Sequence, residues 1–587
     1  MTIAFDASCQ PSIGQRHIAT VGLPTKFVNG FRVISFYPTF IDFIETEPQR
    51  SGIGSSIRAT AMRTTRADDP FIPPSPHSRA SSPRFPRPEY QRSRSSRATV
   101  LQQDHSSFQG GGKNFNFRRF RRFRRVTTLG DFATHHPTIE TTGIEIMQDR
   151  GLFSSRLGFI LTAGGSAVGL GNIWKFPYLA GSNGGAAFLI IYLAIVFSLG
   201  LSVMLAEFAI GRAAGKSAVG AYRDLRGGPW PVAGFLAVLA GFVILAFYSV
   251  VGGWTLTYLA EAVGGGLPSD KDALGAFFGS TISDPLVPII AHGLFMALTA
   301  GIVYAGVGKG IERSNKFLMP LLFLLLIVLT IRAVTLDGAS AGIAFFLEPD
   351  FSKVTAETVN AALGQAFFSL SLGFGVLIAY GSYFDRREDL PKAAMMVTGL
   401  DTLVALLAGF IILPAVFAFG FSPGAGPGLT FITLPAIFAA MPLGGIFATA
   451  FFLLLAIAAL TSAVSVLEAV VAHLIDEHGH GRRQSTILSA AVIFALGIPA
   501  SLSFGPWSDT MVGGKTIFDL MDYFASNLLL PIGGILISLF VGWSIKPRAV
   551  DEVHEGRDNP FRLTPIWIAI LRYVAPLAIA WILISGI

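Results

Sequence analysis

Charge and cysteine are both scarce in this chain. Asp, Glu, Lys and Arg together make up 14% of its 587 residues, and Cys9 is the single cysteine. Soluble domains carry about 25% charged residues, so this composition argues against a soluble fold. A single cysteine excludes an intrachain disulfide framework, and it leaves no set of thiolates for a metal site.

Signatures of catalysis are missing as well. The sequence shows no Ser, His and Asp arrangement of hydrolase type, and its 10 histidines are scattered. The segment GVGKGIE at 306–312 superficially resembles a nucleotide-binding loop, but no strand precedes it. We therefore predict that the protein is not an enzyme.

Long apolar segments dominate the chain instead. Hydrophobic residues make up 51% of the sequence, and a helix needs about 20 mostly apolar residues to cross a bilayer. Eleven segments are close to or above this length, which predicts an all-α multi-pass membrane protein. They lie at about 156–179, 185–210, 232–262, 286–306, 312–334, 359–383, 394–420, 444–476, 486–504, 517–543 and 563–586. A shorter stretch at 430–440, between two prolines, is predicted to be a re-entrant or extracellular helical loop.

Lysine and arginine are distributed unevenly between the loops. One set of alternate loops holds 16 of them, whereas the opposite set holds only Lys271, Lys353 and Lys515. Positively charged loops stay in the cytosol. We therefore predict a cytosolic N-terminus and, with eleven spans, a C-terminus outside.

Residues 1–146 differ from the rest of the chain. They hold 20 Lys and Arg against 11 Asp and Glu, and they include the repeat FRRFRRFRRV at 117–126. This low-complexity basic composition is typical of disorder. Three interpretations stay open: upstream sequence before a true start at Met147, a disordered tail, or a tail that binds anionic lipid or nucleic acid. No nucleic acid is expected to bind the 147–587 domain.

Two predicted spans contain segments that suit a helix poorly. GGSAVGLGNIWKFP at 164–177 begins with four glycines in eight residues, and SLSLGFG at 369–375 lies five spans later. Glycine costs roughly 1 kcal/mol per helical position, and lipid offers no partner to freed backbone groups. Paired broken helices in two halves of a chain predict a secondary transporter whose site lies near the bilayer midplane.

Specific motifs extend over nearly the whole chain from about residue 150. They are RLGFILTAGGSAVGLGNIWKFPYLAGSNGGAAF at 156–188, AEFAIGR at 206–212, GQAFFSLSLGFG at 364–375, TFITLPAIF at 430–438, LTSAVSVLE at 460–468 and FDLMDYF at 518–524. Together they resemble the neurotransmitter:sodium symporter family, of the bacterial leucine-transporter type. The resemblance implies five spans repeated in inverted topology, with spans 1 and 6 unwound. Repeat one would cover about 156–334, repeat two about 359–543, and span 11 about 563–586.

The resemblance further implies a site for an amino acid. Backbone amides of Leu170 and Gly171 would hold its carboxylate with the Tyr248 hydroxyl, and Val251 would join the side-chain wall. The whole substrate site would comprise Ala167, Leu170, Gly171, Ile244, Tyr248, Phe368, Ser369, Ser371, Phe374, Ser462 and Val466. Gly169 stands where relatives that carry monoamines have Asp, so the substrate is expected to bring its own carboxylate. The wall is apolar with two hydroxyls, which favours a neutral, hydrophobic amino acid.

Two Na⁺ sites are implied in the same way, in line with the preference of hard cations for oxygen ligands. The first would be formed by Ala167, Asn172, Ser369 and Asp401, and completed by the substrate carboxylate. The second would be formed by Gly165, Val168, Ala458, Thr461 and Ser462. The alternative for the two hydroxyls of this second set is a bond to a backbone carbonyl one turn back.

Asp401 departs from the leucine-transporter pattern, which has Asn at this position and Glu one turn later, where this chain has Ala405. Animal relatives bind chloride nearby to balance charge. Since a carboxylate supplies that charge itself, and since carboxylates inside membranes are costly and functional, we predict transport without chloride. A further interpretation stays open, in which Asp401 takes up a proton on the return step of the transport cycle, giving H⁺ antiport.

Gates are implied on both sides of the site. The outer gate would consist of Lys175, Asp522 and Gln365, and the inner gate of Arg150, Asp476 and Tyr383. Ordinary solvated charge is the alternative for the inner pair. Glu207 in span 2 is expected to bond the unwound backbone of span 6.

These features predict a Na⁺-coupled symporter in the plasma membrane, the inner membrane of a bacterium, with the lipid bilayer and an amino acid as its partners. An amino-acid sensor on the same fold is one alternative, and the intact gates argue against it. An H⁺-coupled transporter is the other, and the Thr461–Ser462 pair with Asn172 argues against that.

Overall fold

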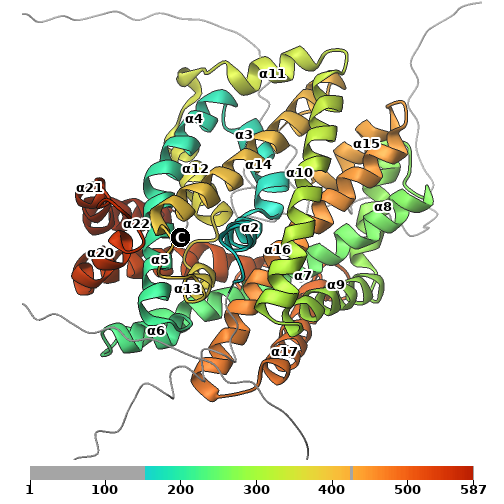
Figure 1. Ribbon diagram of the computed structural model, residues 1–587. Helices are drawn as coiled ribbons and strands as arrows, with labels where there is room; N and C mark the ends of the chain where they lie inside the picture. The colour runs from blue at the N-terminus through green and yellow to red at the C-terminus, as the bar shows by residue number, and fades with distance from the viewer. Residues whose placement is uncertain (1–152, 424–427, 586–587) are drawn as a thin grey trace, which may run out of the picture. The chain divides into compact units, whose positions relative to one another are not determined.

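The computed structural model describes residues 153–423 and 428–585. The predictions about 1–146, Met147 and Arg150 therefore lie outside the described residues. Within those residues the chain is helical, and the only β pairing is an isolated bridge between Val512 and Lys515. Figure 1 shows the helices packed side by side. The all-α class predicted from the sequence is confirmed.

Nine helical segments are long and apolar enough to cross a membrane. They are Ala186–Ala214 (α4, η3 and α5), Pro231–Gly264 (α7), Val287–Tyr304 (α9), Val307–Val334 (η4 and α10), Leu390–Ala418 (α14), Gly444–His478 (α16), Arg482–Leu502 (α17), Ile517–Ser544 (α18 to η8) and Thr564–Ser585 (α21 to α22). Each overlaps one of the eleven predicted spans.

The two remaining predicted spans are the interrupted ones. Span 1 consists of α2 (Arg156–Ala167) and a second part, Gly171–Ser182, formed by η2 and α3 and bent from α2 by 51°. Span 6 consists of α12 (Ala356–Ser369) and α13 (Val376–Gly381). The first break is narrower than the glycine-rich motif suggests, because α2 continues through two of its glycines.

Short helices fill several connections. They are α6 (Ala218–Leu225), α8 (Lys271–Ser283), α11 (Ala339–Leu347), η6 (Leu429–Thr433) with α15 (Leu434–Ala439), and α20 (Lys546–His554). The loop predicted to be helical at 430–440 is thus helical. The segment at 306–312, which superficially resembles a nucleotide-binding loop, is mostly the π-helix η4 (Val307–Glu312), and η4 runs directly into α10 (Arg313–Val334).

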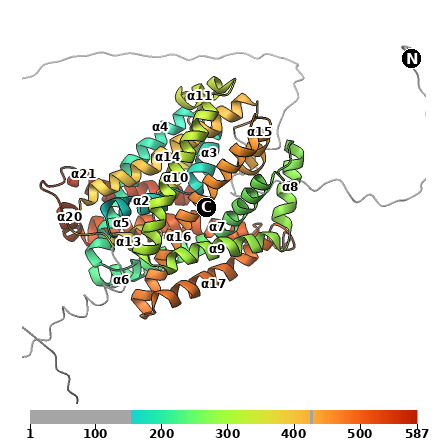
Figure 2. The same cartoon turned by 45° about the vertical axis from the view of Figure 1, so that its right-hand side comes forward.

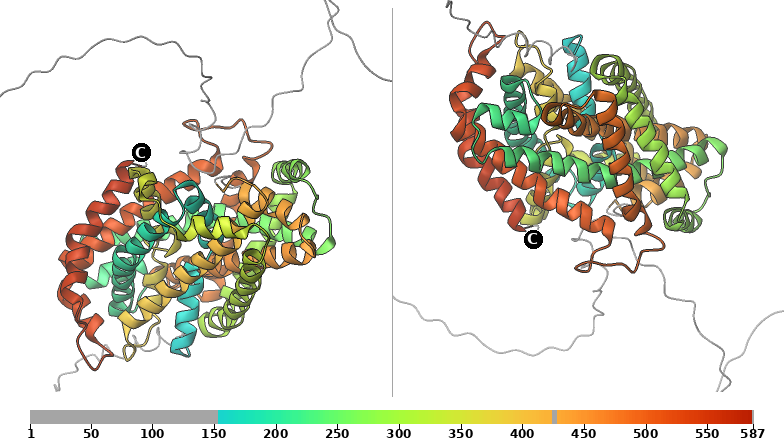
Figure 3. Two further views of the ribbon diagram at one scale, coloured as in Figure 1. Left: turned by 90° about the horizontal axis from the view of Figure 1, so that it is seen from above. Right: turned by 90° about the horizontal axis from the view of Figure 1, so that it is seen from below.

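The broken spans lie in the middle of the bundle. α2 is packed between α10, α14 and α16, and α13 lies against α5 (Leu201–Ala214) (Figure 1). α9 and α17 run beside α7 (Figure 2). The C-terminal helices flank one side (Figure 3), where α22 (Ala575–Ser585) packs on α19 (Leu530–Leu539). The apolar windows of the α10 and C-terminal spans are only 28% and 22% buried, so these helices face lipid and the breaks do not.

Glycines allow α5 and α13 to approach closely. A methyl group on Gly211 of α5 would overlap the Ile378 carbonyl, and one on Gly381 of α13 would come within 2.6 Å of the Phe208 carbonyl oxygen. Small residues at such contacts let membrane helices pack backbone against backbone. This contact fixes α13, and with it the inner end of the second break.

We expect Gly211→Ala to destabilise the protein by about 1–3 kcal/mol, because the added methyl group meets rigid backbone. Thermal unfolding of the purified protein in detergent measures this. Gly399→Ala is the matched control, since a Cβ there meets nothing within 4 Å; it should be neutral or stabilising. Equal melting temperatures for the two variants would contradict the close contact.

Candidate functional site

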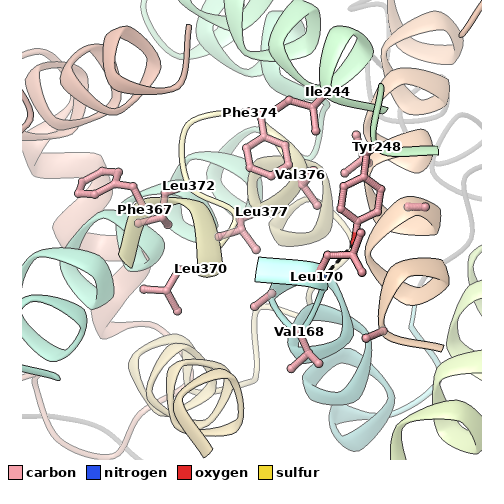
Figure 4. Close-up of a cluster of buried hydrophobic side chains, with 14 of the residues drawn as sticks. Val168, Leu170, Ile244, Tyr248, Phe367, Leu370, Leu372, Phe374, Val376 and Leu377 are labelled. Atoms are coloured by element: carbon pink, nitrogen blue, oxygen red, sulfur yellow. Dashed lines mark hydrogen bonds between the residues drawn. The ribbon is translucent and has the colours of Figure 1, made fainter. Parts of the chain in front are cut away.

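The break in span 1 leaves backbone groups facing the interior. Helix α2 ends because Val168 is extended, with φ −72° and ψ 108°. The Gly169 amide then donates to Oδ1 of Asn172 at 3.1 Å, and the Leu170 amide donates to the Tyr248 hydroxyl at 3.3 Å. Figure 4 shows Leu170 and Tyr248 pointing toward one another. The break is thus held by side chains and not by a continued helix.

The break in span 6 has a different local cause. Gly373 and Gly375 have φ of +93° and +73°, and Ser371 has φ of +56°, which is uncommon for a residue with a side chain. The Ser371 hydroxyl donates to the Ser166 carbonyl at 3.0 Å, which joins the two breaks. The Gly373 amide donates to Glu207 at 2.8 Å. The predicted bond from Glu207 to the unwound backbone is therefore confirmed.

A cavity lies between the two breaks and α7. It is lined by Ala167, Gly169, Leu170, Gly171, Ile244, Leu245, Tyr248, Phe368, Ser369, Ser371, Phe374, Ser462 and Val466. All eleven residues predicted for substrate binding are among them. A Cβ on Gly169 would come within 3.1 Å of the Tyr248 hydroxyl and 3.2 Å of Ser462 Cβ, so glycine keeps this part of the cavity open.

A second cavity adjoins the first. Leu170, Gly171, Tyr248 and Phe368 line both cavities, and Val251, Lys175 and Asp522 line only the second one. The Lys175 ammonium lies 4.6 Å from the centre of the Phe368 ring. The Gln365 amide donates to the Gly171 carbonyl at 2.8 Å. Of the three predicted outer-gate residues, Lys175 and Asp522 thus line the second cavity, and Gln365 bonds Gly171, which also lines it.

Oxygen atoms gather around Asp401, which is fully buried on α14. Its carboxylate accepts from the Asn172 amide at 2.7 Å and from the Ser369 hydroxyl at 2.9 Å. All partners of this carboxylate in the described part of the chain are neutral. A buried carboxylate without a positive partner is strongly unfavourable. The cluster is therefore suited to a small cation or a proton.

The residues predicted for the second Na⁺ site lie on α2 and α16, which pack together. The Thr461 hydroxyl donates to the carbonyls of Ile457 and Ala458, both at 3.1 Å. For Thr461, this is the backbone bonding that the sequence left as the alternative for both hydroxyls. It leaves the lone pairs of the hydroxyl oxygen available to a cation. Among the described residues, no group of three or more His, Cys, Asp or Glu is arranged to hold a metal.

The inner end of the site contains an ion pair that the sequence did not reveal. Glu468 on α16 is fully buried, and its carboxylate accepts from Arg482 at 2.7 and 2.9 Å and from the Tyr383 hydroxyl at 2.8 Å. Asp476 accepts from the Ser217 amide at 2.6 Å. Arg150, its predicted partner, lies outside the described residues. A carboxylate deep in an apolar span was a sufficient signal for Glu468, whereas Arg482 was interpreted only as a loop charge.

Comparison with known proteins gives consistent matches. The profile of the sodium:neurotransmitter symporter family matches residues 150–273 and 287–587. A Bacillus subtilis protein described as an uncharacterized sodium-dependent transporter is 42% identical over 430 residues, 73% of this chain and 95% of that protein. Human sodium- and chloride-dependent GABA transporter 2 is 27% identical over 71% of this chain and 77% of its own length. The crystal structure of MhsT in complex with L-phenylalanine matches at 48% identity and a TM-score of 0.70, over 75% of this chain and 100% of MhsT.

Loss of the arginine from the inner ion pair should be costly. Arg482→Ala leaves Glu468 buried without its cation, which typically destabilises a protein by about 3–5 kcal/mol. Thermal unfolding in detergent measures the loss. Arg483→Ala is the control, because Arg483 is exposed and lies over the Tyr304 ring. Similar melting temperatures for both variants would rule out a structural role of the pair.

Proposed function

Because the chain belongs to the sodium:neurotransmitter symporter family and is a sodium-dependent transporter, we propose that it imports a neutral, hydrophobic amino acid with Na⁺ by alternating access. The observation that carries this proposal is the cavity between the two broken helices, next to the oxygen cluster of Asp401. The proposed location is the inner membrane of a bacterium, with a cytosolic N-terminus and an external C-terminus.

The substrate class follows from the polarity of the cavity. An amino acid brings an anion and a cation, and each needs a partner when water is excluded. The amides of Leu170 and Gly171 and the Tyr248 hydroxyl are proposed to bind the carboxylate, since helix N-termini favour anions. The side-chain end of the cavity is bounded by Ile244, Phe374 and Val466. MhsT, which was solved with L-phenylalanine, supports an apolar substrate.

Two Na⁺ ions are proposed to couple transport to the gradient. The first would bind among Asn172, Ser369 and Asp401, where a cation would balance the charge of the buried Asp401 carboxylate. The substrate carboxylate would complete this site, so ion and substrate bind together. The second would bind between α2 and Thr461, where a cation joins the mobile half-helix to α16.

Chloride is proposed to be unnecessary. Asp401 lies beside Ser369, whose hydroxyl is also 3.4 Å from the Tyr192 hydroxyl. A carboxylate at this place supplies a fixed negative charge, and a second anion there would be repelled. The Ala405 side chain one turn later is buried and apolar, so it adds no further charge.

Uptake into proteoliposomes tests the proposed function. With an inward Na⁺ gradient in chloride-free buffer, we expect accumulation of phenylalanine or another hydrophobic amino acid. A tenfold gradient and two ions per substrate set a limit of roughly 100-fold accumulation, since each tenfold ratio is worth about 1.4 kcal/mol. Uptake driven by a proton gradient alone would favour the H⁺-coupled alternative. Sodium-dependent binding without uptake would favour a sensor.

Asp401→Asn tests the role of the carboxylate. Without chloride, we expect the apparent Na⁺ affinity for uptake to fall at least about tenfold, because hydrogen bonds and contacts to a charged group are worth ~1.5–3 kcal/mol. Added chloride should restore part of it. Glu357→Gln, which neutralises an exposed carboxylate, is the control. The proposal would be contradicted if uptake by the wild-type protein required chloride. It would also be contradicted if uptake by Asp401→Asn responded to neither Na⁺ nor chloride.

A further inference from the structure

The inner end of α2 rests on the start of span 5 through one carboxylate. Glu312, the last residue of η4, has a side chain only 1% exposed. It accepts from the Ser154 amide at 2.7 Å, from the Ser154 hydroxyl at 2.6 Å and from the Ser155 hydroxyl at 3.1 Å. Ser155 in turn caps α2 by accepting from the Gly158 amide at 3.1 Å. Glu312 therefore binds the residue that begins the half-helix.

Glycines on α2 make this approach possible. A methyl group on Gly158 would overlap the Glu312 carboxylate, and one on Gly165, two turns further, would overlap the Asn315 amide oxygen. Asn315 is buried, and its amide oxygen has no hydrogen-bond partner. The same face of α2 thus fits closely against two polar side chains of span 5, one at its inner end and one near the break.

The contact is also easy to re-form. Lys316 lies four residues after Glu312 on the same helix, and its ammonium is 2.7 Å from the carboxylate. If α2 separated from span 5, Lys316 would stay beside Glu312 and keep its charge paired, and water would replace the serine groups. A contact that is strong when two segments touch, and whose groups are solvated when the segments separate, suits a helix that leaves its neighbour and returns to it.

We propose that Glu312 is a positioning residue that holds α2 closed on the cytosolic side and thereby sets how readily the transporter opens inward. This inference rests on the proposed alternating-access function. Val168, whose extended backbone ends α2, lies between α2 and the outer half of span 1. The Glu312 contact differs from the predicted inner gate, because its residues, Ser154, Ser155 and Glu312, are not among those predicted for that gate.

A cysteine accessibility experiment tests the proposal on the full chain. Cys9→Ala removes the single native cysteine, and Thr162→Cys places a thiol at a buried position of α2. Inside-out vesicles are treated with a small maleimide in buffer with and without Na⁺. We expect Glu312→Gln to raise the labelling rate in both buffers, by about tenfold with Na⁺. Ser154→Ala should raise it less and add nothing to Glu312→Gln, since both remove the same contact.

The control is Glu477→Gln, which removes a cytosolic carboxylate that binds Arg223 on α6, away from α2. It should leave the labelling rate unchanged. Labelling of Glu312→Gln at the rate of its parent, or additive effects of Glu312→Gln and Ser154→Ala, would overturn the proposal. If Na⁺ does not slow labelling of the parent while Glu312→Gln still speeds it, the positioning role stands and the Na⁺-coupled function fails.

Discussion

Every polar group of a backbone inside a membrane must find a partner within the protein, and the rest of this structure depends on how that demand is met at two broken helices. Regular helices satisfy it internally. At the breaks, Tyr248, Asn172 and Gln365 bond the backbone of span 1, while Glu207 bonds that of span 6. These side chains come from spans 1, 2, 3 and 6, so the bundle must be complete before either break is stable. The polar backbone groups of the two breaks that these side chains do not bond line the cavity.

Buried carboxylates show where the charge balance is complete and where it is not. Glu468 is neutralised by Arg482, and Glu312 by Lys316 on its own helix. Glu207 and Asp401 receive only neutral donors, the Gly373 amide in the first case and the Asn172 amide and Ser369 hydroxyl in the second. Asp401 differs from Glu207 because its partner Ser369 lines the cavity, so the cation proposed to enter with substrate would balance the charge of Asp401.

The sequence was sufficient for the parts of this picture that are local. Long apolar runs predicted the spans, and glycines at 164–171 and 369–375 predicted both breaks, though the first is shorter because α2 tolerates Gly164 and Gly165. The residues around the cavity came from the family resemblance. What could not be predicted depends on contacts between distant segments: Glu468 meets Tyr383 across 85 residues, and Glu312 meets Ser154 across 158. In both pairs, the sequence around one residue does not indicate which distant residue is its partner.

The two sides of the cavity are closed by different sets of contacts. On the outer side, Phe431 of η6 packs against Trp174 of span 1 and Trp254 of α7, with ring centres 6.2 Å apart in both cases. On the inner side, Phe159 of α2 packs against Phe153 and Phe384, with ring centres 5.4 and 4.1 Å apart, and Glu312 accepts hydrogen bonds from Ser154. Apolar packing weakens gradually as surfaces separate, whereas hydrogen bonds are lost within a short distance. The hydrogen bonds to Glu312 are therefore the inner contacts most sensitive to a small displacement of α2, and this half-helix also carries the carbonyls proposed to bind Na⁺. Ion binding at the break and closure at the base act on the same short helix, so each must influence the other.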